Sequence, residues 1–339
     1  MSRDDHPGCR LATEAALAHL LLPLSPWLDD DSITEILING PGAAWVEQAG
    51  RLQPVAVCPG QSQLRAIARL VASASQVETL EQDATLEGNW RDWRVTVVLP
   101  PVAADGVCLA LRRHRRHALP LADWGTPDGE VLAQLRAALE RHDNILVAGA
   151  TGSGKTTLLA GLLAEIDARE RLVCLEDTPE LPRLGAHQVL LRTRHGHDLR
   201  SLLRLALRLR PDRLVVGEVR GAEAFDLLQA MATGHRGCLG TLHAADPRGA
   251  LARLEQLILT CGLDWPLPAV RAQIAASVQL LVQVARTPRG RAVTDIVRLS
   301  GVADAEYRML SCIGKVAAPQ ARPAAVPVPV QSSHRNPSG

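Results

Sequence analysis

Two different patterns of apolar and polar positions follow one another along the chain. In the first pattern, short apolar runs bounded by Pro and Gly predict β-strands at 33–39, 43–47, 93–100 and 107–113. Apolar residues at helical spacing predict helices over 11–22 and 61–74. Together these elements predict a small α+β domain over residues 1–116, followed by a flexible linker in the Pro-, Gly- and Asp-rich stretch 117–129.

From residue 130 onward, strands and helices alternate. The predicted strands are continuous apolar runs, at 144–149, 171–176, 187–192, 213–218 and 238–243. The predicted helices are amphipathic, at 130–141, 155–168, 198–209, 222–232 and 247–260. Because such strands are buried on both faces, the alternation predicts an α/β domain with a parallel-rich sheet over 130–316. A Pro-, Ala- and Ser-rich tail, 317–339, is predicted to be disordered.

Composition indicates a folded protein of ordinary kind and excludes several classes, but it does not indicate a specific function. The 339 residues suffice for two domains, and the formal charge of +1 argues against binding nucleic acid through bulk electrostatics. The seven cysteines form no C-x-x-C pair, so we expect reduced thiols in the cytoplasm rather than a disulfide framework or a zinc site. No apolar run reaches the roughly 18 residues of a membrane span, so we expect membrane association through partners only.

The sequence GATGSGKT at 149–156 matches the phosphate-binding motif G-x-x-x-x-G-K-[ST], between a predicted strand and a predicted helix. Glycines let the backbone N–H groups surround phosphate oxygens, and the helix N-terminus adds the positive end of its dipole. Lys155, one of only two lysines in the chain, is predicted to bind the β- and γ-phosphates, while Thr156 is predicted to bind Mg²⁺. The predicted nucleotide-binding residues are Gly149, Ala150, Thr151, Gly152, Ser153, Gly154, Lys155, Thr156 and Thr157.

Polar side chains end three of the other predicted strands. One apolar strand ends in Glu218, a second ends in Glu176, with Asp177 and Glu180 behind it, and a third ends in His243. Because the carboxyl ends of parallel strands meet at one edge of a sheet, these side chains are predicted to gather near the phosphate loop. In a P-loop sheet the strand beside that loop often ends in a carboxylate, so Glu218 is predicted to polarise the water that attacks the γ-phosphate.

Four motifs in a fixed order carry a resemblance to a known family. They are GATGSGKTT, CLEDTPEL, LRLRPDRLVVGEVRGAEAFDLLQAM and TGHRGCLGTLHAADPRGALARLE, which match a Walker A motif, an Asp box, a glycine-glutamate Walker B motif and a His box. In that order they closely resemble the secretion ATPases that power type II and type IV secretion, conjugation and pilus assembly. The N-terminal DDDSITEILINGPGAAWVEQAGRL resembles the tight-adherence (Tad/Flp, CpaF-like) pilus branch and also conjugation-type relatives. The match covers residues 28–300.

The resemblance implies a fold and a site. It implies a RecA-like P-loop domain preceded by a smaller, PAS-like α+β domain, with ATP and Mg²⁺ at the phosphate loop. It implies catalysis by Glu218, Mg²⁺ binding by Asp177, and support of the γ-phosphate or the metal by Glu176, Glu180 and His243. It also implies a homo-hexameric ring in which arginines close over the nucleotide. The candidate arginines are Arg94, Arg112 and Arg113 in the first domain and Arg194 and Arg210 in the second.

The predicted function is that of a cytoplasmic, hexameric ATPase, peripheral at the inner membrane through the platform proteins of a pilus or secretion machine. ATP hydrolysis would drive motion between its two domains. One alternative is a conjugation-type DNA-transfer ATPase or a nucleic-acid translocase, although aromatic residues make up only 2% of the chain and direct nucleic-acid binding is not expected. The other alternative is a structural ring component that binds nucleotide without hydrolysing it.

Overall fold

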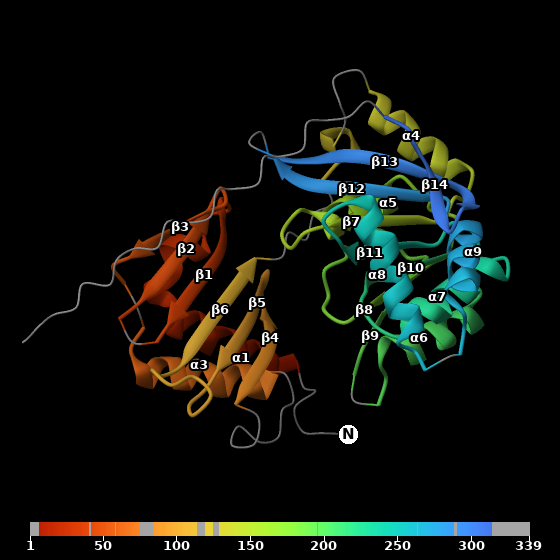
Figure 1. Cartoon of the computed structure of the whole chain (residues 1–339). Coiled ribbons are helices and arrows are strands. Elements are labelled where there is room, and N and C mark those ends of the chain that lie inside the picture. The colour runs from red at the N-terminus through yellow and green to blue at the C-terminus, as the bar shows by residue number, and fades with distance from the viewer. Residues whose placement is uncertain are drawn as a thin grey trace, which may run out of the picture. The chain divides into compact units, whose positions relative to one another are not determined.

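The computed structural model describes residues 7–40, 42–57, 59–74, 84–113, 119–124, 129–194, 196–262, 264–287 and 290–313. The chain divides into two compact units, Met1–His117 and Ala118–Gly339 (Figure 1). The predicted disordered tail, 317–339, lies outside the described residues. Among the described residues, no helix combines the length and the apolar character that crossing a membrane requires.

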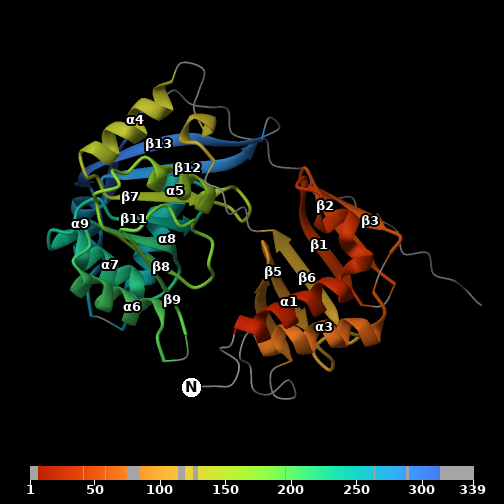
Figure 2. The same ribbon diagram turned by 180° about the vertical axis from the view of Figure 1, so that it is seen from behind.

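An antiparallel sheet with helices on one face forms the N-terminal unit. The described strands lie in the order β3-β2-β1-β6-β5-β4. The strands are β1 (Ile33–Asn39), β2 (Ala44–Gln48), β3 (Arg51–Val55), β4 (Thr85–Trp90), β5 (Trp93–Val98) and β6 (Cys108–Arg113). The helices are α1 (Pro7–Leu20), α2 (Ser25–Leu28) and α3 (Gln61–Ala74), with a 3-10 turn η1 (Leu22–Leu24). Helices α1 and α3 lie side by side on one face of the sheet (Figures 1 and 2).

Period-two alternation decides which face of this sheet is buried. On β1, Ile36 and Ile38 are buried and pack in one core with Ile67 of α3, whereas Glu35 lies on the opposite, open face. The strands predicted at β1, β2, β5 and β6 and the helices predicted at α1 and α3 are present. Strand β3 was not predicted because it lies at the sheet edge and most of its residues are exposed, so its sequence shows no apolar alternation.

An α/β arrangement with a parallel-rich sheet forms the second unit, as predicted. The described strands lie in the order β14-β13-β12-β7-β11-β10-β8-β9; neighbours from β12 to β9 are parallel, and β13 and β14 extend the sheet antiparallel. The strands are β7 (Ile145–Gly149), β8 (Leu172–Glu176), β9 (Gln188–Arg192), β10 (Arg213–Val219), β11 (Leu239–His243), β12 (Leu280–Thr287), β13 (Gly290–Ala303) and β14 (Glu306–Ser311). The helices are α4 (Glu130–Glu140), α5 (Lys155–Ala164), α6 (Leu199–Ala206), α7 (Glu223–Ala232), α8 (Pro247–Leu259) and α9 (Leu267–Ser277), with 3-10 turns η2 (Leu121–Trp124) and η3 (Leu207–Leu209).

Helices cover both faces of this sheet (Figures 1 and 2). One apolar core contains buried residues of η2, α4 and α5, and the other contains buried residues of α6, α7, α8 and α9. We call the two sides of the sheet the α5 face and the α7 face. Along β10, Leu214 and Val216 join the core of the α7 face while Val215 joins that of the α5 face. This burial on both sides explains why these strands are continuous apolar runs.

Residues 119–124 of the predicted linker are packed into the second unit. Leu121 and Trp124 are only 1% and 4% exposed and belong to the core of the α5 face. Two glycines on α5 and at its start allow this approach: a Cβ on Gly161 would lie 2.9 Å from the carbonyl oxygen of Leu119, and a Cβ on Gly154 would lie 2.7 Å from the indole of Trp124. This stretch is therefore an ordered part of the second unit, and the prediction of a flexible linker is wrong for it.

Candidate functional site

The phosphate loop runs from the end of β7 to the start of α5. Gly152 and Gly154 have φ angles of 70° and 101°, in the left-handed region that residues with a Cβ adopt at a cost. The backbone turns at these two glycines, and α5 begins directly after them at Lys155. The first N–H groups of an α-helix have no partner within the helix and carry the positive end of its dipole. The loop and the start of α5 together therefore form a site for an anion.

The Lys155 side chain lies along the inside of this loop. The residue is only 8% exposed, and its Nζ donates hydrogen bonds of 3.1 Å to the carbonyl oxygens of Gly149 and Ala150. The hydroxyl of Ser153 is buried without a hydrogen-bond partner, and a Cβ on Gly149 would lie 2.4 Å from it. A buried ammonium group and an orphaned hydroxyl inside a glycine loop fit the oxygens of a nucleoside triphosphate.

The donor set around the loop fits Mg²⁺ only in combination with such a nucleotide. No group of three or more His, Cys, Asp or Glu side chains within the described ranges could hold a metal ion. Mg²⁺ commonly binds through substrate phosphates together with a few protein oxygens, and the half-buried Thr156 in the first turn of α5 can supply one of these. The residues present thus agree with the predicted pair of ATP and Mg²⁺.

The carboxyl ends of four parallel strands lie at the edge that also carries the phosphate loop, in the order β7-β11-β10-β8. Strand β11 is the direct neighbour of β7 and pairs His243 with Gly149. Strand β10, which carries Glu218, is the next strand along. The prediction that the strand of Glu218 lies beside the phosphate-loop strand is therefore wrong by one strand. Sequence order does not fix sheet order, because a helical crossover can return the chain to either side of a strand.

His243 joins the His box directly to the phosphate loop. A nitrogen of its ring lies 2.9 Å from the hydroxyl of Thr151. Burial lowers the pKa of His243, the positive charges of Lys155 and Arg253 lower it further, and the negative charge of Glu218 partly opposes them. The shift favours the neutral imidazole, and Glu218 and Lys155 both lie within electrostatic reach of it.

Glu176 acts as the anchor of a turn. The residue is only 2% exposed, and its Oε1 accepts hydrogen bonds from the backbone N–H groups of Glu180, at 2.8 Å, and Leu181, at 2.6 Å. Its Oε2 is buried without a partner. Burial raises the pKa of Glu176, although the two N–H groups oppose this shift. This carboxylate thus fixes the segment that carries Asp177 and Glu180, while its predicted part in catalysis, like that of Glu180, stays a prediction.

Replacing Glu176 by Gln should change how stability depends on pH. Because the folded state raises the pKa of Glu176, its contribution to the free energy of unfolding is fully present below the ordinary glutamate value of 4.5 and is lost as the pH rises through the raised pKa. We therefore expect the wild type to lose stability relative to Glu176→Gln as the pH rises. Thermal unfolding of both proteins from about pH 4 to about pH 8 measures this difference. A difference that stays constant over the range would contradict the assignment.

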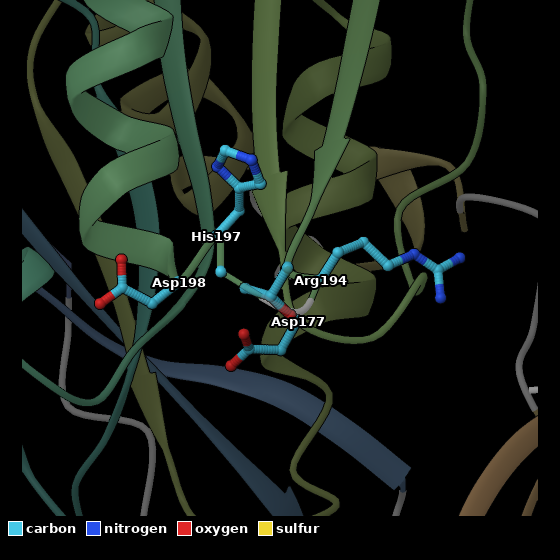
Figure 3. A pocket seen from close by; sticks show the side chains of 6 residues that line it. Asp177, Arg194, His197 and Asp198 are labelled. Atoms are coloured by element: carbon cyan, nitrogen blue, oxygen red, sulfur yellow. The ribbon is translucent and has the colours of Figure 1, made fainter. Parts of the chain in front are cut away.

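A pocket of about 560 Å³ opens beside Asp177 (Figure 3). The residues lining it are Asp177, Thr193, Arg194, Gly196, His197 and Asp198. The Arg194 side chain extends away from the carboxylates of Asp177 and Asp198 (Figure 3). Asp177 forms an ion pair with Arg220, and Asp198 caps α6 by accepting the N–H of Ser201 at 2.8 Å. Mg²⁺ binding by Asp177 stays a prediction, and the metal would compete with Arg220 for that carboxylate.

The candidate arginines of the N-terminal unit differ in their surroundings. Arg113 is engaged within its unit: its side chain is 6% exposed, stacks 4.4 Å from the ring centre of Trp93 and donates a 2.6 Å hydrogen bond to the carbonyl of Leu28. Arg94 and Arg112 face each other on neighbouring strands, and their side chains are 27% and 46% exposed. Contact of Arg113 with the nucleotide stays a prediction. Arg94 and Arg112 are the more accessible candidates, on the open face of the sheet.

The remaining candidate arginines and two further polar residues of the second unit lie in different places. Arg194 is exposed at the pocket, and Arg210 is exposed at the end of η3, in a left-handed backbone conformation. His235 precedes β11 and lies at the opposite end of that strand from His243. Thr241, which precedes His243 by two residues, was not singled out because one buried Thr within an apolar run carries no signal of its own.

Comparisons with known proteins agree with this arrangement. A profile of the family described as type II/IV secretion system protein matches residues 21–312. A relative from Mycobacterium tuberculosis, named for conjugal transfer, is 38% identical over 299 residues, which cover 83% of this chain and 84% of the relative. The type IV secretion system protein PtlH of Bordetella pertussis is 33% identical over 316 residues, covering 80% of this chain and 91% of the relative.

One solved structure shows the same fold. The pilus retraction motor PilT, determined with bound ADP, aligns with a TM-score of 0.63 at 21% sequence identity. The alignment covers 86% of this chain and 82% of that protein. The succession of an N-terminal unit and a P-loop unit along one chain is thus shared with that protein.

Proposed function

The chain belongs to the type II/IV secretion system protein family, and on this premise we propose that it is the ATP-hydrolysing motor of a secretion or pilus-assembly machine. The observation that carries the proposal is the direct contact between the phosphate loop and the His box, where His243 lies 2.9 Å from Thr151 and in register with Gly149. A purely structural glycine turn needs no polar side chain from a neighbouring strand. The contact supports a site in which a nucleotide bound at the phosphate loop also affects His243 at the end of β11.

The residues at this edge take distinct roles in the proposal. Lys155 moves from the carbonyl oxygens of Gly149 and Ala150 to the β- and γ-phosphates, which also accept hydrogen bonds from the start of α5. Glu218 accepts the proton of the attacking water as general base. Thr156 and the phosphate oxygens would hold Mg²⁺, which would supply positive charge to those oxygens. His243, whose lowered pKa favours the neutral ring, can donate or accept a hydrogen bond near the γ-phosphate.

Steady-state phosphate release tests the proposal. Purified full-length protein should hydrolyse ATP in the presence of Mg²⁺, and removing Mg²⁺ with a chelator should abolish the activity. ATP binding without turnover would instead identify a structural ring component that uses nucleotide for assembly.

The proposal includes a homo-hexameric ring in which arginines of the N-terminal unit act on the nucleotide. Its support is the open face of the N-terminal sheet, where Arg94 and Arg112 are in register and partly exposed. Their partners, Glu87 at 2.7 Å and Glu35 at 3.8 Å, are exposed or partly exposed carboxylates, and such surface ion pairs contribute little to stability. Both guanidinium groups can therefore exchange partners at low cost.

Removing these two arginines should reduce ATP hydrolysis without unfolding the protein. Arginine contacts to a transferring phosphoryl group are worth about 10³-fold or more in rate when they act as fingers, so Arg94→Ala/Arg112→Ala should lower kcat by up to that factor. The matched control is Arg65→Ala/Arg69→Ala, which removes two exposed arginines from α3 on the other face of the sheet. ATPase rate against protein concentration, with light scattering for mass, measures both properties.

Two outcomes of that experiment would speak against the ring. A full-length monomer whose specific activity is independent of concentration would contradict assembly. Equal activity of the two double variants and the wild type would remove Arg94 and Arg112 from the nucleotide site, leaving the phosphate loop and Glu218 unaffected.

The last part of the proposal concerns which machine this motor serves. We place the protein in the cytoplasm, at the inner membrane through platform proteins, and we retain the tight-adherence pilus branch suggested by the N-terminal motif. A conjugation-type role in DNA transfer is the second candidate, because the relative from Mycobacterium tuberculosis is named for conjugal transfer. Adding DNA to the ATPase assay separates the classes: a translocase acting on DNA is stimulated, whereas a pilus motor is not. A pilin gene or a relaxase gene beside this one would separate the two machines.

A further inference from the structure

Strand β10 contains a β-bulge at the residue predicted to be catalytic. Val216 pairs with Gly240 of β11, but the next pair joins Val219 to Leu242. Three steps along β10 therefore correspond to two steps along β11, so Gly217 and Glu218 together face the single residue Thr241. Such bulges are rare between parallel strands, and active sites are one of the places where they are over-represented and can re-aim a side chain.

The bulge decides on which face of the sheet Glu218 lies. Leu214 and Val216 belong to the core of the α7 face, so unbroken alternation would put Glu218 on that face as well. Instead Val219 joins the α7-face core, which is possible only because the extra residue shifts the alternation by one. Glu218 is thereby removed from the apolar α7 face and assigned to the α5 face, where the helix of the phosphate loop packs.

The other polar strand ends lie on the same α5 face. Cys174 and Leu239 belong to the α5-face core, and residues two or four positions further along a strand share their face. Glu176 on β8 and His243 on β11 are such residues. The bulge is therefore what brings Glu218 onto the face of Glu176 and His243, in agreement with the influence of Glu218 on the pKa of His243.

Two features hold the bulge in place. The hydroxyl of Thr241, a residue only 1% exposed, donates a 2.6 Å hydrogen bond to the carbonyl oxygen of Gly217. On the other side, a Cβ on Gly217 would lie 3.3 Å from both Cγ of Glu176 and the carbonyl oxygen of Leu175, so glycine permits the close approach of β8. A bulge disrupts the backbone ladder, and the Thr241 hydroxyl supplies a donor to a carbonyl group at that disruption.

We propose that Thr241 is a positioning residue for ATP hydrolysis: its hydroxyl locks the bulge at Gly217–Glu218 and so keeps the Glu218 carboxylate on the face of the phosphate loop. The inference rests on the proposed function, since it assigns Thr241 a role through the general base Glu218. Without the hydroxyl, the Gly217 carbonyl loses this donor and the bulge can shift along β10. The phosphate loop on β7 does not depend on this bond, so nucleotide binding should be retained.

Thr241→Val tests the inference because it replaces the hydroxyl by a methyl group of similar size. We expect kcat to fall by about 10- to 100-fold, as for a small misplacement of a catalytic group, with KM for ATP unchanged. Thr241→Ser keeps the hydroxyl and should restore kcat. Thr241→Ala is a second variant without the hydroxyl and, because it adds no atoms to the strand, serves if the Val variant does not fold. The matched control is Thr260→Val, which removes a hydroxyl bonded to Gln256 at the far end of α8.

A double variant separates positioning from general loosening of the sheet. If Thr241 acts through Glu218, Thr241→Val should lower the residual rate no further in a Glu218→Gln background. Wild-type kcat in Thr241→Val or Thr241→Ala, or a further loss in the double variant, would overturn the role of Thr241 and leave the proposed ATPase intact. Failure of the proposed function is seen separately, as a wild-type protein that does not hydrolyse ATP.

Discussion

Lys155→Ala should abolish ATP turnover, with phosphate release falling by at least about 10² to 10³-fold, the loss typical of removing one preorganised donor from a developing charge. Lys155 is only 8% exposed and its ammonium group lies inside the phosphate loop, 3.1 Å from two carbonyl oxygens of that loop. Alanine removes both the charge and the reach of the side chain. ATP affinity should fall as well, because the β- and γ-phosphates lose their cationic partner.

The same substitution has a second readout that does not depend on catalysis. The charge of Lys155 lowers the pKa of His243, so Lys155→Ala should raise that pKa toward its ordinary value. An NMR titration of the His243 ring measures this shift in the absence of nucleotide. Arg169→Ala is the matched control, since it removes one cation from the turn after α5. The Arg169 side chain is 90% exposed. Near-normal hydrolysis and ATP affinity in folded Lys155→Ala would refute the assignment of the phosphate loop.

The sequence predicts most of the second unit because its strands are unusual. An uninterrupted apolar run such as β7 or β8 is buried on both faces, and this pattern survives without knowledge of its neighbours. The predicted phosphate loop is equally local, because a glycine-rich turn between a strand and a helix depends on adjacent residues only. Strands β12 to β14 were not predicted. Strand β12 pairs parallel with β7, and β13 and β14 extend the sheet antiparallel to its edge, and both arrangements are decided by packing between distant segments.

Trp124 illustrates a different limit of prediction. Pro, Gly and Asp around it indicate a linker, yet its side chain is buried against Gly154 of the phosphate loop. The composition of a segment describes its own flexibility, whereas the glycines that accommodate this one lie about 30 to 40 residues further along the chain. Contacts of that kind need the folded structure.

The placement of Glu218 could not be derived from its sequence for a related reason. Alternation along RLVVGEV puts Glu218 on the face of Leu214 and Val216, which is the apolar face covered by α6 to α9. The bulge that reverses this depends on Thr241 from another strand and on the close approach of β8 at Gly217. The sequence predicts a carboxylate at the end of this strand, but it does not predict the face of the sheet on which the Glu218 side chain lies.

Glu218→Gln should keep ATP binding and lose hydrolysis, with kcat falling by about 10² to 10⁴-fold as expected for loss of a general base. The amide has nearly the shape of the carboxylate and can still form hydrogen bonds, so the bulge and the phosphate loop should be unchanged, but it cannot take a proton from water. Equilibrium binding of ATP and phosphate release, measured on the same preparation, separate the two steps. Glu306→Gln controls for the loss of one carboxylate, because Glu306 lies on β14 with a side chain that is 72% exposed.

The titration of His243 completes this test, because the two site variants should move it in opposite directions. The negative charge of Glu218 raises the pKa of His243, so Glu218→Gln should lower it, whereas Lys155→Ala should raise it. Opposite shifts would place both charges around the imidazole that contacts Thr151 at 2.9 Å. No shift in Glu218→Gln would mean that the carboxylate points away from the phosphate loop, and loss of ATP binding with unchanged turnover per bound nucleotide would make Glu218 a structural or metal-binding residue instead of the base.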